Sequence, residues 1–530
     1  MLIKEYKIKN RFILFSKNLK NIITKYIISK VRKLFLSFQK KYKNKLSKKK
    51  ISKKVIFLTS IFLIFITYGS YNFGKRVFNK VYYKFGLNEQ VSKFKERVTI
   101  KPEIRKALPI IPRNYLKGLL AKTNVLEINI SNKNLRLLKK YRDRALKKGA
   151  FFKEKTDYIN AKIVFNDKIH PVQMRLKGDL LDHLQGNKWS YRLKILGDNS
   201  ILGMKKFSLQ SPKVRNYLGE PIFHKLLEYE NIPNLRYELV KLKINGKDFG
   251  IYSIEEHFDK FLIENNRMRE GIVVGLNEND YWKETLKEYS KIFGWDVDQA
   301  YDREYKVFDS KRVLSNPNLQ SQANYAISLL KGFLDGDLKS SEVFDVDLIA
   351  RYFAIIDLAG ASHAYSWNNL RFIFNPLNQR LTPVGFDGDA GNRTRNLSLN
   401  ASQLEKFFKD KEFLKEYIKN LERISNKEYL DNFFEINKNI FINFQDQMYL
   451  SYPWIDSIDN YFDLIKWNQG FIKDRLNLTN PITIKILEKN NLIDKIQLSN
   501  RASFPLVVNS IFYNKKLIYK PKEKIVLPPR

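Results

Sequence analysis

The stretch YELVKLKINGKDFGIYSIEE, residues 237–256, decides the fold of the central part of the chain. Apolar and polar residues alternate through residues 237–244, as they do in a strand with one buried face. Asn245-Gly246 then gives the strongest short-range signal for a two-residue hairpin turn. The alternation resumes after this dipeptide, so the stretch predicts two antiparallel strands joined by a tight turn.

Similar alternating runs precede this hairpin, and helical patterns follow it. The runs before it include VLEINI, AKIVF, PVQMRL, WSYRLKI and KFSLQ. After about residue 345, helices are predicted at 346–359, 402–423, 427–447 and 458–475. Strands followed by helices predict an α+β domain, strand-rich in its N-terminal part and helix-rich in its C-terminal part.

An uncharged stretch near the N-terminus predicts one transmembrane helix. Residues 55–74 carry no charged side chain over 20 positions, which is long enough to cross about 30 Å of hydrocarbon. A signal peptide is the alternative, but the leader before this stretch is too long for one, and no small-residue cleavage site follows. Residues 40–54 hold nine Lys or Arg and residues 74–89 hold four. This asymmetry predicts a cytoplasmic N-terminus and an extracytoplasmic main domain.

The positive charge is concentrated in the leader. Of a formal net charge of +41, residues 1–54 contribute 19 Lys or Arg against one acid. The leader is either an amphipathic helix on anionic lipid or a solvated basic arm. We therefore expect a lipid bilayer as a partner, and we do not expect the folded domain to bind nucleic acid. The chain has no cysteine, which excludes disulfides, thiolate nucleophiles and Cys-based zinc sites.

These patterns predict five consecutive parts. They are a basic cytoplasmic leader (1–54), a transmembrane helix (55–74), a juxtamembrane linker (75–122), the main domain (123–480) and a small C-terminal β segment (481–530).

Two short strands predict a place where oxygen ligands meet. The runs at 371–374 and 380–386 flank a turn, with Asn369 before the first strand and Asp387 after the second. Opposite positions of an antiparallel pair lie about 5 Å apart, so an amide and a carboxylate oxygen would converge, as Mg²⁺ prefers. Asp389 would add a second carboxylate. A surface hairpin closed by polar residues is the alternative.

Six segments stand in order along the chain: RLKG (175–178), KWSYRLKI (188–195), GMKKFSLQSP (203–212), LKINGKDFGIYSIEEHFDK (242–260), HAYSWNNLRFIFNP (363–376) and TPVGFDGDAG (382–391). Together they resemble the successive motifs of the CotH (spore coat protein H) family of kinase-like proteins. The resemblance implies an atypical protein-kinase-like fold. It also implies that ATP and Mg²⁺ are cofactors and that phosphate is transferred to a protein or envelope component.

The resemblance also implies roles for individual residues. Asn369 matches the catalytic-loop asparagine and Asp387 the metal-binding aspartate. The implied nucleotide-binding residues are Lys188, Arg192, Gly178 and Glu256. Lys188 and Arg192 share one face of a predicted strand, and a solvated face is the alternative for them.

The chain departs from the family where an acid usually precedes the catalytic-loop asparagine. His363-Ala364 stands there, which resembles a branch of the family with His-Ala in this place. His363 is the candidate general base, because the unperturbed pKa of histidine is near 6.5; a structural, hydrogen-bonded histidine is the alternative. Two functions stay open: a membrane-anchored phosphotransferase, and a catalytically inactive kinase-like binding or structural module of the cell envelope.

Overall fold

The structure is a computed structural model in which one of two compact units is described. The chain divides into residues 1–100 and 101–530. The described residues are 104, 107–148, 151, 157–178, 181–184, 186–277, 304–489, 493–502, 504–513, 515–523 and 525–528. Among them no helix is both long and apolar enough to cross a bilayer. The predicted leader and the stretch 55–74 lie outside the described residues.

The hairpin predicted at residues 237–256 is confirmed. β6 (Tyr237–Ile244) and β7 (Lys247–Glu256) pair antiparallel across Asn245-Gly246. Both turn residues have positive φ, 48° and 77°, which suits Asn and Gly in a two-residue hairpin turn. Asn245 also bonds to the chain just after β1 (Asn124–Asn129). Its Oδ1 accepts from the Ile130 N–H at 2.7 Å, and its Nδ2 donates to the Ile130 carbonyl at 2.9 Å.

Asn245→Ala is expected to lower the free energy of unfolding by about 2 kcal/mol, because two hydrogen bonds are lost and alanine is strained at positive φ. Chemical denaturation measures this change. Glycine adopts the positive φ of this turn without strain but lacks the hydrogen-bonding side chain, so Asn245→Gly is expected to lower the free energy of unfolding by about 1 kcal/mol. An alanine variant as stable as the parent chain would contradict this account of the turn.

Seven strands close into a barrel in the order β1-β2-β3-β4-β5-β7-β6. The other four strands are β2 (Ile159–Phe165), β3 (Lys168–Leu176), β4 (Tyr191–Ile195) and β5 (Lys206–Gln210). β1 and β6 run parallel, with Leu126 opposite Leu242, and this pair closes the barrel. Alternate apolar side chains, among them Met174, Phe207 and Tyr252, form one core, to which α6 (Asn132–Lys148) adds Leu138.

The predicted fold class, an atypical protein-kinase-like domain with a strand-rich N-terminal part and a helix-rich C-terminal part, is wrong. The structure mixes helices and strands, but its N-terminal strands form a closed barrel; the predicted transmembrane helix at 55–74 lies outside the described residues. The physical reason lies in the closing pair. Alternation predicts that a strand exists but carries no signal for its partner, and the β1–β6 pair joins segments more than 100 residues apart in the chain.

A second, antiparallel sheet has the strand order β11-β10-β8-β9. Its strands are β8 (Val273–Leu276), β9 (Tyr305–Val307), β10 (Arg371–Asn375) and β11 (Arg380–Pro383). The predicted pairing of the runs at 371–374 and 380–386 is confirmed, with Asn375 opposite Arg380 and Phe372 opposite Pro383. This hairpin brings the chain before β10 close to the chain after β11.

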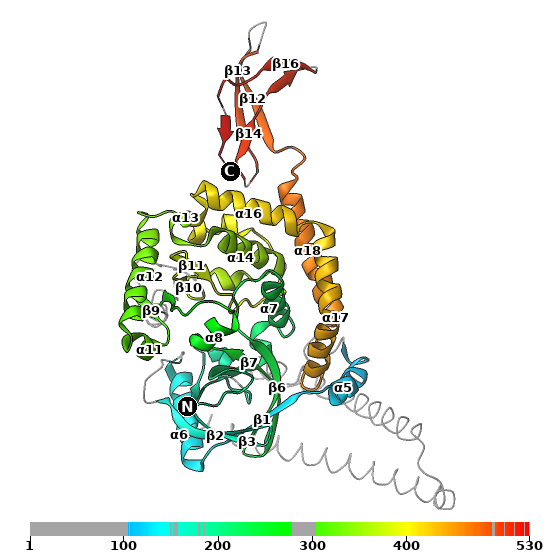
Figure 1. Ribbon diagram of the computed structural model, residues 1–530. Coiled ribbons are helices and arrows are strands. Elements are labelled where there is room, and N and C mark those ends of the chain that lie inside the picture. Colours follow the sequence, from blue (N-terminus) through cyan, green and yellow to red (C-terminus); the bar gives the residue numbers. More distant parts are fainter. Residues whose placement is uncertain are drawn as a thin grey trace, which may run out of the picture. The chain divides into compact units, whose positions relative to one another are not determined.

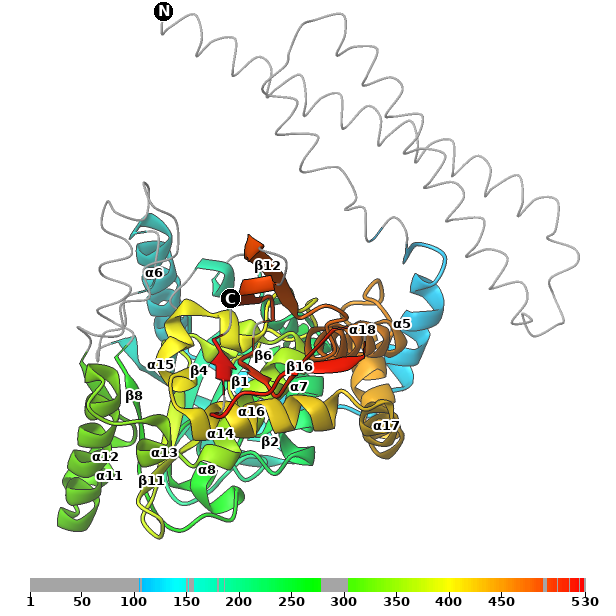
Figure 2. The ribbon, with the colours of Figure 1, turned by 90° about the horizontal axis from the view of Figure 1, so that it is seen from above.

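Helices surround the buried helix α14 (Val346–Ala359), in which ten residues are buried. The remaining helices of the core are α7 (Gly219–Tyr229), α8 (Lys260–Asn265), α11 (Ser310–Leu314), α12 (Pro317–Asp335), α13 (Ser340–Val343), α15 (Glu405–Phe408), α16 (Lys411–Ile424), α17 (Lys427–Tyr449) and α18 (Ile458–Leu476). Figures 1 and 2 both place α14 between α12 on one side and α17 on the other. The largest apolar cluster of the described residues includes the buried side chains of α14.

Part of the stretch predicted as a linker, 75–122, is folded. α5 (Ile111–Leu120) packs against α17 and the turn after it. A Cβ on Gly118 would lie 2.3 Å from the backbone nitrogen of Leu450, and Asn114 Nδ2 donates to the Pro453 carbonyl at 3.0 Å. The close contact requires glycine, so the helix belongs to the folded unit.

The C-terminal segment forms three antiparallel strand pairs. β12 (Ile482–Lys489) pairs with β13 (Ile493–Asn500), β14 (Leu506–Val508) with β17 (Ile525–Leu527), and β15 (Ile511–Tyr513) with β16 (Lys516–Tyr519). Strands were predicted for residues 481–530, and the first of them begins at Ile482.

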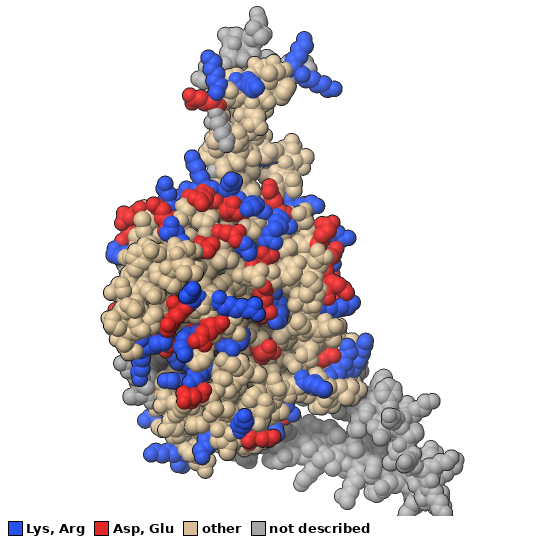
Figure 3. All heavy atoms as spheres, viewed as in Figure 1, with Lys and Arg blue, Asp and Glu red and all other residues tan. Residues whose placement is uncertain are grey.

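Charges of both signs are interspersed on the face of the molecule seen in Figure 3. Where charged residues gather on that face, Lys and Arg lie next to Asp and Glu. A nucleic-acid interface typically presents a stripe of basic residues on one face. The face in view lacks such a stripe.

Candidate functional site

Residues 385–391, here called the Asp387 loop, follow β11 and turn against the start of α7. Asp387 and Asp389 both have left-handed backbone, with φ of 56° and 46°. This conformation is costly for residues other than glycine and persists only where the surroundings fix it. The buried carboxylate of Glu220 does so, because it accepts from the Gly388 N–H at 3.0 Å and the Asp389 N–H at 2.9 Å.

The Asp387 carboxylate is 6% exposed and faces two basic side chains. The Nε of Arg215, at the end of η3 (Pro212–Arg215), donates to Oδ1, and His363 Nδ1 lies 3.4 Å from Oδ2. Burial by itself favours the protonated form. The charge and hydrogen bond of Arg215 outweigh burial and hold the pKa of Asp387 below its usual range. Asp387 is therefore a carboxylate at neutral pH.

His363 and Asn369 form a fixed pair beside this carboxylate. His363 lies on η4 (Ser362–Tyr365), and Asn369 Nδ2 donates to its carbonyl at 2.9 Å. His363 Nδ1 lies 2.9 Å from the Asp387 carbonyl and 3.0 Å from Asn369 Nδ2. The Asp387 carbonyl accepts a hydrogen bond from Nδ1 only in the tautomer that has the proton on Nδ1, and the neutral ring then has its lone pair on Nε2. The side chain of His363 is 48% exposed, which leaves Nε2 accessible to a substrate.

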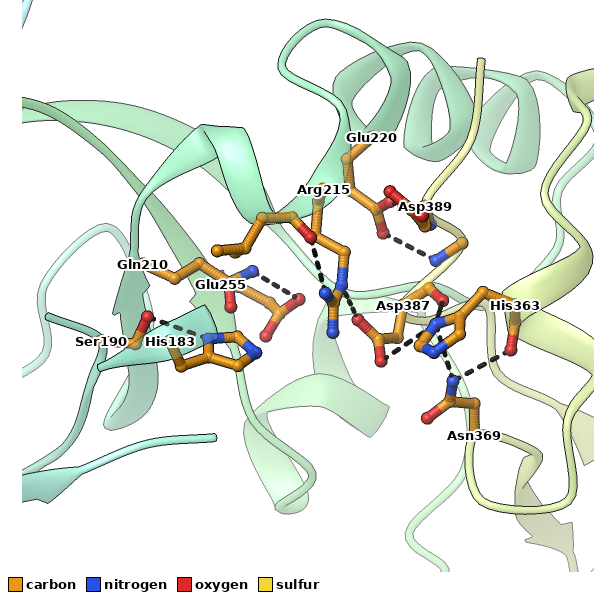
Figure 4. A network of polar contacts seen from close by, with 12 residues as sticks. His183, Ser190, Gln210, Arg215, Glu220, Glu255, His363, Asn369, Asp387 and Asp389 are labelled. Carbon is orange, nitrogen blue, oxygen red and sulfur yellow. Dashed lines mark hydrogen bonds and ion pairs between the residues drawn. The ribbon is translucent and has the colours of Figure 1, made fainter. Parts of the chain in front are cut away.

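The barrel places a lysine within electrostatic range of Asp387. Lys177, directly after β3, donates from Nζ to Glu255 Oε2 and to Gln210 Oε1, both at 2.7 Å. Burial lowers the pKa of Lys177, although the charge of Glu255 opposes this shift and that of Asp387 also acts on it. Figure 4 shows Gln210 and Glu255 on one side of Arg215, and Asp387, His363 and Asn369 on the other.

The sequence placed His363, Asn369 and Asp387 in one site, and the structure brings all three together. Asp389 lies in the same loop, bound through its backbone to Glu220. Burial raises the pKa of Asp389, although Arg215 opposes this shift. The surroundings therefore favour the ionised carboxylate at Asp387 and disfavour it at Asp389.

Lys188 is not brought to this group. Its Nζ donates to the Ile251 carbonyl at 2.9 Å and lies 4.6 Å from the centre of the Tyr452 ring and 5.4 Å from that of Tyr252. Burial lowers the pKa of Lys188 to about 8, and Asp248 opposes this shift. These contacts hold the barrel against the turn after α17, so the structure gives Lys188 a packing role.

The other implied nucleotide-binding residues lie in the barrel wall and beside it. Glu256 is 1% exposed and accepts from Arg236 Nε at 3.0 Å. Arg192, on β4, lies opposite Arg175 of β3 in the strand register. Gly178 has φ of 100°, and a Cβ there would lie 2.4 Å from the side chain of His183. Gly178 therefore allows the chain after Lys177 to pack closely on η2 (Leu181–His183).

Four residues of the site were missed by sequence reasoning: Lys177, Arg215, Glu220 and Glu255. Lys177 lies inside the RLKG motif, and Glu255 is the neighbour of the residue chosen, Glu256. Alternation separates the two faces of a strand but does not tell which face meets the rest of the protein. Arg215 and Glu220 carry no local signal of their role.

The side chains present fit a Mg²⁺ ion bound together with a phosphate-bearing ligand. Asp387 supplies an ionised carboxylate, and Asn369 turns its amide oxygen away from His363 (Figure 4). No group of three or more His, Asp or Glu in the described residues is arranged to hold a metal ion. Magnesium commonly takes one or two carboxylates and completes its shell with water and substrate phosphates. The donor set matches this mode and not an all-protein metal site.

Comparisons with known proteins add no family to this description. No protein-family model matches the chain, and no curated protein matches it. What the site can do therefore follows from its own geometry and chemistry.

Proposed function

We propose that this chain is a Mg²⁺- and ATP-dependent phosphotransferase that acts on a hydroxyl group of a protein or envelope component. One observation carries the proposal: Arg215 pairs with Asp387 of the Asp387–His363–Asn369 group and lies within electrostatic range of Glu255, the partner of the buried Lys177. Phosphoryl transfer needs cations for the phosphates, hard oxygen ligands for Mg²⁺ and a group that orients or deprotonates the acceptor. This group offers all of them, and the six motifs that resemble the CotH family support the same activity.

Lys177 would neutralise phosphate oxygens of the nucleotide. Glu255 and Gln210 hold its Nζ from two sides at 2.7 Å, so the ammonium group is positioned before the ligand arrives. A group fixed in advance needs no reorganisation during the reaction, and this makes its electrostatic contribution large.

Asp387 and Asn369 would hold Mg²⁺ through the carboxylate and the amide oxygen. When bound, Mg²⁺ neutralises charge on the transferring phosphate. Arg215 keeps Asp387 ionised, and Glu220 keeps the Asp387 loop in place.

His363 would accept the proton of the acceptor hydroxyl at Nε2. A bond forms between the acceptor oxygen and the γ-phosphorus of ATP, and the bond from that phosphorus to the leaving ADP oxygen breaks. The proton on Nδ1 stays on the ring, hydrogen-bonded to the Asp387 carbonyl, and this bond fixes the tautomer.

Binding of a phosphate-bearing ligand without turnover is the second candidate function. Two observations favour it. Arg215 already neutralises one oxygen of Asp387, and Ala364, fully buried, occupies the place where the related motif has an acid.

A thermal-shift titration of the full-length chain with MgATP tests the proposal. At ATP about 100-fold above its dissociation constant we expect stabilisation of about 2.7 kcal/mol. Asp387→Asn is expected to abolish this response, since it removes the charge that binds the metal. Glu422→Gln, at an exposed acid outside the site, is the control and should respond normally. Release of ADP separates the two candidates, and no response to millimolar MgATP would rule out both for this nucleotide.

A further inference from the structure

A hollow of about 390 Å³ lies beside the candidate site. One wall is the end of α14 with Ser362 and Tyr365 of η4, and the other is the segment 392–396, NRTRN. Ser362 directly precedes His363, and the segment 392–396 directly follows the Asp387 loop. Both walls are therefore continuous with the segments that carry the proposed chemistry. The volume lies in the range of ligand-binding pockets, about 300–1,000 Å³.

The segment 392–396 is tied firmly to α14 and α18. Thr394 Oγ1 donates to the Asp357 carbonyl, and the Thr394 N–H donates to Asn468 Oδ1 at 2.9 Å. Asn468 Nδ2 in turn donates to the carbonyls of Leu358 and Asn392, both at 3.0 Å. Since the backbone around Thr394 is fixed on both sides, its neighbours Arg393 and Arg395 project from a rigid wall.

The hollow presents positive charge. Arg393 and Arg395 both line it and both are exposed. The Arg393 guanidinium also lies 5.0 Å from the centre of the Trp467 ring, a contact that leaves its positive charge in place. The acid of the lining, Asp357, is only 2% exposed. Its carboxylate accepts from the N–H and hydroxyl of Ser398 and from the hydroxyl of Tyr417. The Asp357 carboxylate thus bonds to groups inside the protein and does not face the opening of the hollow. The charged groups at the opening are the guanidinium groups of Arg393 and Arg395.

The spacing of the two arginines matches an extended peptide. They stand two positions apart in a segment without helix, and alternate residues of an extended chain lie about 6.5 Å apart. Guanidinium groups bind carboxylates and phosphates through paired hydrogen bonds. Acidic side chains on alternate residues of a substrate peptide would meet Arg393 and Arg395 in turn.

We propose that this hollow binds an acidic peptide, the acceptor substrate, through oxyanion groups on alternate residues that follow the reacting hydroxyl. The statement that the peptide is an acceptor rests on the proposed function, whereas binding of the peptide does not. The oxyanions are carboxylates of Asp or Glu, or phosphates of residues modified earlier. Acidic residues bound in the hollow place the preceding hydroxyl residue towards His363.

The test is fluorescence anisotropy with the full-length chain and the labelled peptide Ala-Ser-Glu-Ala-Glu. A second peptide carries Gln in place of both Glu, and a third carries phosphoserine in place of both. We expect the Glu or the phosphoserine peptide to bind at least tenfold more tightly than the Gln peptide, and the tighter of the two identifies the oxyanion. The double variant Arg393→Gln/Arg395→Gln is expected to lose this preference. Arg267→Gln/Arg269→Gln, an exposed pair with the same spacing, should retain it.

Equal binding of the three peptides, or an unchanged preference in the Arg393→Gln/Arg395→Gln variant, overturns the inference. Both arginines are exposed, so the variant is expected to unfold at the same temperature as the parent chain. The MgATP titration separates the two proposals. An arginine-dependent preference without any response to MgATP leaves this inference standing and the proposed phosphotransferase refuted, and the reverse result refutes the inference alone.

Discussion

Lys177→Met is expected to lower ADP release from MgATP by about 10²–10³-fold, whereas Lys188→Met is expected to leave it within about twofold. Lys177 donates hydrogen bonds to Glu255 and Gln210, and it interacts electrostatically with Asp387. Lys188 bonds instead to the Ile251 carbonyl. The two variants remove the same charge from the same barrel, so their difference reports the position of the lysine.

Stability has to be separated from activity in this comparison, because Lys177→Met leaves the Glu255 carboxylate buried without its cation. Breaking a buried pair from one side costs about 3–5 kcal/mol, while replacing both partners by apolar residues is often close to neutral. Lys177→Met/Glu255→Met is therefore expected to recover stability in a denaturant titration but not activity. A loss of ADP release in Lys188→Met, with full release in Lys177→Met, would contradict the structure and favour the role first implied for Lys188.

Glu230→Ala is expected to lower the free energy of unfolding by about 3 kcal/mol. The Glu230 side chain is 4% exposed and follows α7. It accepts from Arg423 at 2.9 Å and 2.5 Å and from the Tyr429 hydroxyl at 2.7 Å, and Arg351 lies 3.7 Å away. Removing the carboxylate leaves the Tyr429 hydroxyl without its acceptor and Arg423 with Asn420 as its remaining hydrogen-bond partner, while Arg351 keeps its bond to Asp347.

Asp431→Ala is the matched control for Glu230→Ala. Asp431 pairs with Lys466 at 3.4 Å, but their side chains are 43% and 49% exposed. Exposed ion pairs contribute about 0–1 kcal/mol, so denaturant titration should show a much smaller change. Equal losses of the free energy of unfolding in the two variants would mean that burial does not set the strength of these ion pairs.

Because α7 carries Glu220 in its first turn, Glu230→Ala is also expected to weaken MgATP binding.

The local structure was predictable where a few neighbouring residues decide it. Asn245-Gly246 predicted a hairpin because positive φ at two successive positions suits few other residues. The run 346–359 predicted α14 with its observed bounds, because its apolar spacing and Gly360 after it are signals within one segment. The meeting of Asn369 and Asp387 followed from one hairpin, β10–β11, with a short turn.

Local sequence signals do not indicate which distant strands pair, and the predicted fold class was wrong for this reason. Nothing near Leu126 or Leu242 indicates that β1 and β6 lie side by side, since alternation looks the same in an open sheet and in a closed barrel. Lys188 and Glu256 were implied by the family resemblance, whereas the structure places Lys177 and Glu255 nearer to Arg215 and Asp387 in electrostatic terms. Glu255 and Glu256 are neighbours on β7, but Lys177 follows β3 and Lys188 precedes β4, so only the folded barrel distinguishes them.

The sequence by itself determined the two hairpins, helix α14 and the placing of Asn369 and Asp387 at the two ends of one hairpin, because each depends on contacts within a short stretch of chain. Tertiary structure alone decided which strands close the barrel and which lysine pairs with Glu255. It also decided that Arg215 and Glu220 hold Asp387 ionised and in place. Those contacts join positions about 170 residues apart, and their free energy comes from burial and charge that exist only once the whole chain has folded.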